Sequence, residues 1–188
     1  MELILLDDDT RFYKKVSGMF HRQWKHPNTK AKLVSIYVIK NAKEPGLKLR
    51  FHGTQRACKI GSGSLEACNN AECYLCSILK KGFSIDNAST RSMFGPGIYS
   101  SVVSSKANIY SRNHHVRSHK HVLLLCGLDP GNSVDMTVAG IPGPCDSVEG
   151  LTKAEGGQLD YQETVVYDPA RIKPLGLVVY TREGWTPR

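Results

Sequence analysis

The 188-residue sequence has no long apolar run and no recognisable export signal. Its longest uninterrupted apolar stretch, 122–126, is far shorter than the roughly eighteen residues that a membrane-spanning helix requires. The first residues, 1–15, include acidic side chains where an export signal would begin with basic ones. We therefore expect an intracellular protein, nuclear or cytoplasmic, without a membrane partner.

The sequence also lacks a dense block of basic side chains, although Lys and Arg (25) outnumber Asp and Glu (17) and give a net charge of +8. Basic residues gather only at Lys80–Lys81 and over 112–120, and neither group alternates with aromatic residues as a single-strand nucleic-acid groove would. This distribution is compatible with a charge that serves solubility. An anionic partner such as a dinucleotide, a nucleic acid or an acidic protein is the alternative, which the charge alone favours less because no dense basic block is present.

Cysteine is too sparse for a secreted disulfide scaffold, since only six occur in the chain. Reduced thiols or metal ligands are the interpretation that fits an intracellular protein. The sequence has no internal repeat, and its length suits a single domain over 1–188.

Apolar periodicity predicts one long helix and several strands. Over 10–24, apolar side chains recur at spacings of three and four, which is typical of one face of an amphipathic helix. The aspartates of 7–9 precede this helix and are expected to cap its N-terminus. The stretch 128–160 is rich in glycine, proline and aspartate and is expected to form long loops. We further expect a short helix over 104–110 and strands over 33–39, 47–52, 122–126, 164–167 and 175–180.

These elements predict an α+β fold. Strands outnumber helices, and turn signals separate the strands without the regular βαβ alternation of a doubly wound sheet.

Three segments combine residue types that are suited to chemistry. Phe51-His52-Gly53-Thr54 stands at the end of a predicted strand. The second segment, 93–99, contains Gly-Pro-Gly-Ile-Tyr and is followed by 104–110, which ends in a second tyrosine. The third, 161–168, places Glu163 at the start of a β-branched strand. Each has a plain structural interpretation when taken alone: a strand end, a glycine turn and a solvated carboxylate.

Together and in this order, the three segments resemble the catalytic domain of the poly(ADP-ribose) polymerase family. The resemblance runs from about Leu47 to Tyr180 and includes the eleven-residue step from Tyr99 to Tyr110. It also includes 82–85, which looks like the strand before the loop that covers the donor site. The resemblance implies an ADP-ribosyltransferase fold of two packed, mostly antiparallel sheets with short flanking helices. It also implies an enzyme that splits NAD⁺ and transfers ADP-ribose to a protein or nucleic-acid acceptor.

The resemblance assigns His52, Tyr99 and Glu163 to the centre of the reaction. Breaking the nicotinamide–ribose bond develops positive charge on the ribose, which a nearby carboxylate stabilises. Glu163 would bond the nicotinamide ribose and orient the acceptor. His52 would bond the adenosine ribose, with Thr54 as a second hydroxyl.

The same resemblance makes Tyr99 and Tyr110 the two walls of a slot for the nicotinamide ring, by stacking. Gly53 would lend its backbone N–H and C=O to the carboxamide, an approach that suits a residue without a Cβ. The family usually has a serine three residues before the second tyrosine, where this chain has Ala107. One hydrogen bond to the carboxamide is then missing unless Ser104, Ser105 or water replaces it. The loop expected to cover the donor site, 86–92, is short, so an open donor site is expected.

Four cysteines form an insertion over 58–76, in which Cys73 and Cys76 have the Cys-x-x-Cys spacing of a metal-binding knuckle. With Cys58 and Cys68 they are candidates for a structural zinc site; buried free thiols or two disulfides are the alternatives.

Other functions stay open at this point. Related folds hydrolyse NAD⁺ or remove a 2′-phosphate from tRNA, and the latter would be expected to show an arginine-rich site. A module that holds NAD⁺ or ADP-ribose without turnover is a further alternative, which Ala107 favours and Glu163 disfavours.

Overall fold

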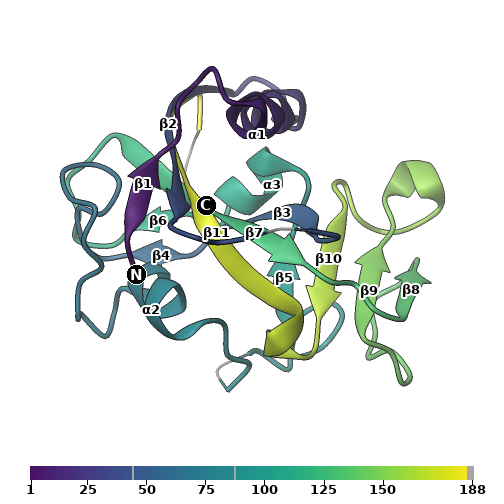
Figure 1. Cartoon of the computed structure of the whole chain (residues 1–188). Coiled ribbons are helices and arrows are strands. Elements are labelled where there is room, and N and C mark those ends of the chain that lie inside the picture. The colour runs from purple at the N-terminus through teal and green to yellow at the C-terminus, as the bar shows by residue number, and fades with distance from the viewer. Residues whose placement is uncertain (44, 87, 186–188) are drawn as a thin grey trace.

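The computed structural model describes residues 1–43, 45–86 and 88–185 (Figure 1). Its largest element is a five-stranded sheet of order β1-β2-β11-β7-β3, in which every neighbouring pair is antiparallel. The strands of this sheet are β1 (Leu3–Leu5), β2 (Lys30–Ile39), β3 (Lys48–His52), β7 (Lys120–Leu128) and β11 (Ile172–Glu183).

Helices cover both faces of this sheet, which explains the continuous apolar run in β7. Successive side chains of a strand point to opposite faces. Leu123 and Leu125 accordingly pack in one core cluster with residues of α1, whereas Leu124 and Cys126 pack in another cluster with residues of α2. The helices are α1 (Arg11–Arg22), α2 (Tyr74–Lys81) and α3 (Ser104–Asn108).

A second sheet of four strands has the order β5-β10-β9-β8. β8 and β9 run parallel, and the other two pairs are antiparallel. A parallel pair of very short strands, β4 and β6, forms a third sheet. The remaining elements are β4 (Gln55–Arg56), β5 (Ile98–Ser100), β6 (Arg112–Asn113), β8 (Ser133–Met136), β9 (Ser147–Gly150), β10 (Glu163–Val166) and the 3-10 turns η1 (Lys153–Glu155) and η2 (Pro169–Arg171).

The two large sheets meet through backbone hydrogen bonds at the edge strand β3. Phe51 of β3 and Ser101, just after β5, form an antiparallel bridge with N–H···O distances of 2.8 and 3.0 Å. Figure 1 shows the second sheet to one side of the first, with β5 and β10 next to β3. This contact brings the end of β3 and the start of β10 to the same region of the molecule.

The α+β prediction is confirmed: the fold is mixed, with mostly antiparallel sheets and few helices. The helix expected over 10–24 is present as α1, but its cap is Thr10 and not the aspartates of 7–9. The Thr10 hydroxyl accepts a hydrogen bond from the Tyr13 N–H at 3.2 Å, because Thr10 directly precedes the first helical residue. Within the described ranges, no helix has both the length and the apolar character needed to cross a bilayer.

The strand expected over 82–85 is wrong. This segment is irregular and follows the helix α2. The helix was not predicted, because the cysteines at its start were interpreted as metal ligands. Leu75 and Leu79 have helical spacing and are buried, and Gly82 ends the helix with a φ of +83°, which glycine adopts without strain.

The expectation of long loops over 128–160 is also wrong in part, since β8 and β9 lie there. Of the loop 86–92, Asn87 lies outside the described residues.

Candidate active site

A cavity of about 240 Å³ opens where β3, β5 and β10 approach α3. It brings together five of the six residues predicted to bind NAD⁺ or act on it. The sixth, Thr54, directly follows Gly53 in the chain but does not line the cavity. The lining consists of Phe51, His52, Gly53, Ser92, Met93, Tyr99, Ser100, Ser101, Lys106, Ala107, Tyr110 and Glu163.

His52, at the end of β3, is fixed by a hydrogen bond to the second sheet. Its Nδ1 lies 2.7 Å from the backbone carbonyl oxygen of Tyr99. A carbonyl only accepts, so Nδ1 carries the proton of the ring. Burial lowers the pKa of His52, with the bond to Tyr99 acting in the opposite direction. In the neutral ring Nε2 keeps a lone pair, which makes it an acceptor for a ligand hydroxyl.

Gly53 occupies a position that no other residue can fill without displacing α3. A Cβ built on Gly53 collides with the backbone carbonyl oxygen of Ala107 and lies 3.1 Å from the amide nitrogen of Ser111. The backbone of Gly53 is therefore pressed against the end of α3, at the edge of the cavity that Gly53 lines. Thr54 continues this segment, and its carbonyl accepts a hydrogen bond from the Arg112 N–H at 3.3 Å.

Tyr99 is held in place by its hydroxyl group. The hydroxyl donates to the Gly95 carbonyl and accepts from the Phe94 N–H, both at 2.9 Å. The Gly-Pro-Gly turn before it permits close packing, because a Cβ on Gly97 would lie 2.5 Å from Cγ1 of Val165. Tyr110 also lines the cavity, and 48% of its surface is exposed, so it lies on the solvent side of the site.

Glu163 opens β10 and is buried, with 6% of its surface exposed. Its carboxylate pairs with the Lys106 ammonium at 3.4 Å. Burial raises the pKa of Glu163, and the charge and hydrogen bond of Lys106 partly oppose that shift. Lys106 was not predicted to be part of the site. Its position directly before Ala107, in the segment 104–110 that resembles the family, is the feature of the sequence that could have indicated it.

Ser104 and Ser105, which were candidates to replace the family's missing serine in binding the carboxamide, do not line the cavity. The Ser104 hydroxyl donates to the Phe20 carbonyl at 2.7 Å. The Ser105 hydroxyl accepts from the Lys25 N–H at 2.9 Å and contacts His26. Both tie α3 to the segment at the end of α1, whereas Ala107 lines the cavity. The protein therefore supplies no hydroxyl from these two positions.

The four cysteines of the insertion meet between β4 and α2, away from the cavity lining. The sulfur atoms of Cys58, Cys68, Cys73 and Cys76 all lie within 4.8 Å of one another, and all four are free thiols. The Cys58–Cys76 and Cys58–Cys73 sulfur distances are 3.5 and 3.6 Å. Zn–S bonds of about 2.3 Å in a tetrahedral site place the sulfurs about 3.8 Å apart, so the cluster has the dimensions of a Cys₄ zinc site.

A buried arginine lies beside this cluster. Arg56 has 1% of its surface exposed, and its guanidinium donates to the carbonyls of Ile60 and Lys120, to the Ser62 hydroxyl and to the Asn113 side chain. Two backbone N–H groups of the same segment point at sulfur: Ala57 to Cys73 at 3.3 Å and Ile60 to Cys58 at 3.5 Å. A positive charge and N–H donors are the surroundings that stabilise metal-bound thiolates.

The chain belongs to the poly(ADP-ribose) polymerase catalytic domain family, whose model matches residues 11–141. The matched span contains His52, Gly53, Thr54, Tyr99 and Tyr110, and it ends before Glu163. It also contains the cysteine cluster. A search of curated proteins finds no match.

Proposed function

We propose that the protein is an NAD⁺-dependent ADP-ribosyltransferase that cleaves the nicotinamide–ribose bond and transfers ADP-ribose to a protein or nucleic-acid acceptor. The observation that carries the proposal is the convergence of His52, Tyr99, Tyr110 and Glu163 on one cavity. These residues come from segments up to 111 positions apart (163 minus 52), and family membership supports the same chemistry.

The residues divide the substrate between them. The Tyr99 and Tyr110 rings take the nicotinamide, and the Gly53 backbone takes its carboxamide. The neutral His52 ring accepts a hydrogen bond from the adenosine ribose through Nε2. Glu163 accepts from the hydroxyls of the nicotinamide ribose, with Lys106 holding the carboxylate in place.

In the reaction the C–N bond between ribose and nicotinamide breaks, and nicotinamide leaves with the electron pair. The positive charge that develops on the ribose is stabilised by the ionised Glu163 carboxylate in a largely buried site, where such stabilisation is strong. A nucleophile of the acceptor then forms the new bond to the ribose and loses its proton. Water in place of the acceptor gives free ADP-ribose instead.

The deciding experiment incubates the protein with NAD⁺ labelled in the adenosine half and measures label transferred to an acceptor against free ADP-ribose. Transferred label supports the proposal, free ADP-ribose alone indicates a glycohydrolase, and binding without turnover indicates a non-catalytic module. Glu163→Gln should reduce transfer by at least about a hundredfold and leave binding nearly unchanged. Glu2→Gln, at an exposed residue that pairs with Lys40, is the matched control and should keep full activity.

We also propose that the cysteine cluster of Cys58, Cys68, Cys73 and Cys76 holds one structural Zn²⁺. Four thiolates fill a tetrahedral coordination sphere and leave no position for a substrate water, so the metal would act through folding and not in the reaction. The cluster connects the end of β4 to α2, and it would stabilise the segment that follows His52, Gly53 and Thr54.

A further inference from the structure

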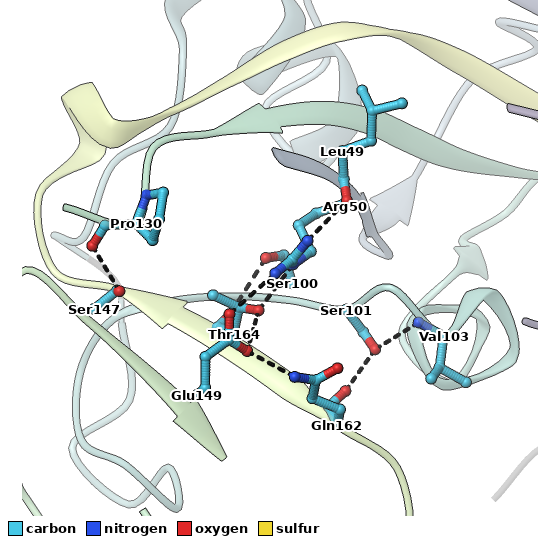
Figure 2. A network of polar contacts seen from close by, with 10 residues as sticks. All are labelled: Leu49, Arg50, Ser100, Ser101, Val103, Pro130, Ser147, Glu149, Gln162 and Thr164. Atoms are coloured by element: carbon cyan, nitrogen blue, oxygen red, sulfur yellow. Dashed lines mark hydrogen bonds and ion pairs between the residues drawn. The ribbon is translucent and has the colours of Figure 1, made fainter. Parts of the chain in front are cut away.

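A buried group of polar side chains joins the two sheets beside the cavity (Figure 2). Arg50, on β3, has 6% of its surface exposed. Its Nε donates to the Thr164 hydroxyl at 2.8 Å and its Nη2 donates to the Glu149 carboxylate at 3.0 Å. Arg50 belongs to the five-stranded sheet and both partners belong to the four-stranded sheet, so the guanidinium bridges the two.

The carboxylate of Glu149 completes this group from β9. Its second oxygen accepts from the Thr164 hydroxyl at 2.8 Å and from the Gln162 side-chain amide at 3.2 Å. Thr164 and Glu149 lie opposite each other in the β9–β10 pairing. The Thr164 hydroxyl therefore uses its proton for Glu149 and a lone pair for Arg50, and both oxygens of Glu149 accept hydrogen bonds.

The group lies next to both halves of the candidate active site. Arg50 is two residues before His52 on β3, so the two side chains share a face of the strand. Gln162 and Thr164 are the direct neighbours of Glu163 on the other sheet.

The backbone on either side of Glu163 is held as well. The Gln162 carbonyl accepts from the Ser101 hydroxyl at 2.6 Å, and the Thr164 carbonyl accepts from the Ser100 hydroxyl at 3.3 Å. Both neighbours of Glu163 are therefore held by backbone as well as side-chain contacts.

A buried ion pair is weak evidence for stability, because desolvation of the two charges offsets their attraction, and apolar replacements are often equally stable. A role in placement explains the arrangement better than a role in stability. The bonds here are directional, and they connect the strand that carries His52 to the strand that carries Glu163.

We infer that Arg50, Glu149 and Thr164 are positioning residues that hold β10, and with it Glu163, at the correct distance from His52 across the bound substrate. The inference rests on the proposed function. A displacement of reacting groups by about 1 Å lowers catalysis by about a hundredfold, so loss of this bridge should lower kcat much more than it weakens substrate binding.

The sharpest test replaces one hydroxyl. Thr164→Val keeps the β-branched shape that suits the strand and removes both hydrogen bonds. It should lower kcat by about ten- to a hundredfold with KM for NAD⁺ nearly unchanged, and hydrogen exchange of the 163–166 amides should become faster. Thr164→Ser restores the hydroxyl and should recover most of kcat.

A second variant removes both charges together, so that neither is left buried without its partner: Arg50→Met with Glu149→Met. It should fold with a melting temperature close to that of the wild type and show the same loss of kcat. Arg171→Met is the matched control, since Arg171 pairs with Asp129 and Asp146 and none of the three lines the cavity; it should lose stability and keep kcat.

The inference is overturned if Thr164→Val and the double variant both fold and keep wild-type kcat and wild-type exchange at β10. It is also overturned if the loss of activity in these variants is no larger than their loss of folded protein, so that kcat per folded molecule stays at the wild-type value, as expected for Arg171→Met. A wild-type protein without NAD⁺ turnover would refute the proposed function and the catalytic part of this inference. The exchange rates of β10 would still decide whether the bridge holds Glu163 in place.

Discussion

The ammonium of Lys106 lies 3.4 Å from the carboxylate of Glu163, and both side chains are largely withdrawn from solvent, with exposed fractions of 17% and 8%. Burial raises the pKa of Glu163 and Lys106 opposes the shift. The tyrosines that face the carboxylate, Tyr99 and Tyr110, have raised pKa values and stay uncharged at neutral pH. Among the residues that the structure describes, Lys106 is the neighbour that favours the ionised state of Glu163.

Lys106→Met should move the acidic limb of the pH–rate profile to higher pH. With the ammonium gone, burial acts unopposed and the pKa of Glu163 rises further, so the carboxylate is protonated, and activity lost, earlier as the pH falls. The measurement is kcat/KM for NAD⁺ between about pH 4 and pH 8. Lys40→Met, which breaks the exposed pair with Glu2, is the control and should leave the limb in place. A limb that stays fixed or moves to lower pH in Lys106→Met would contradict this assignment.

Gly53→Ala should abolish NAD⁺ binding and lower stability by about 1–3 kcal/mol, because the new Cβ collides with the Ala107 carbonyl and must push α3 away from β3. Gly143→Ala is the control: its Cβ meets nothing within 4 Å. Calorimetric binding and thermal unfolding measure the two effects. Wild-type affinity in Gly53→Ala would mean that the Gly53 backbone does not contact the ligand.

Ala107→Ser should tighten the binding of nicotinamide or benzamide-like compounds by up to about tenfold, the value of one added hydrogen bond. Ala107 lines the cavity, and the hydroxyls of Ser104 and Ser105 are engaged with the backbone at Phe20 and Lys25. Ala107→Cys adds a side chain of similar size with a weak donor, and it should gain little. Equal affinity of all three proteins in calorimetry would show that the carboxamide is already satisfied.

The cysteine cluster should contain about one equivalent of zinc in protein purified without added metal. Cys73→Ser combined with Cys76→Ser should release the metal and lower the melting temperature, since two of four ligands are lost. Cys145→Ser, outside the cluster, should retain both the metal and the melting temperature. Absence of metal by elemental analysis, with all six thiols open to a thiol reagent, would refute the zinc proposal.

Local sequence patterns could predict those parts of the site that depend on short segments. Gly53 beside His52 and the Gly-Pro-Gly turn before Tyr99 are close backbone contacts, and glycine marks such contacts directly. Glu163 could be singled out because it directly precedes the β-branched residues of a predicted strand. The helix α1 followed from its periodic apolar face.

Pairs that form only on folding could not be predicted in this way. Arg50 and Glu149 are 99 positions apart, and Lys106 and Glu163 are 57 positions apart (163 minus 106). No short segment of the sequence therefore contains both members of either pair. The helix α2 was not predicted for a different reason. Cys73 directly precedes it and Cys76 lies within it, and their Cys-x-x-Cys spacing is also typical of metal binding.

The bridge between Phe51 and Ser101 is made by main-chain atoms alone, so it survives any substitution that preserves the backbone path. The two sheets are therefore joined at this edge of the cavity by two hydrogen bonds that do not depend on side chains. On the solvent side of the cavity, Tyr110 is the most exposed aromatic residue of the lining. A substitution at position 51 or 101 that keeps this backbone path would therefore change the side chains of the lining and leave the main-chain contact between the sheets in place.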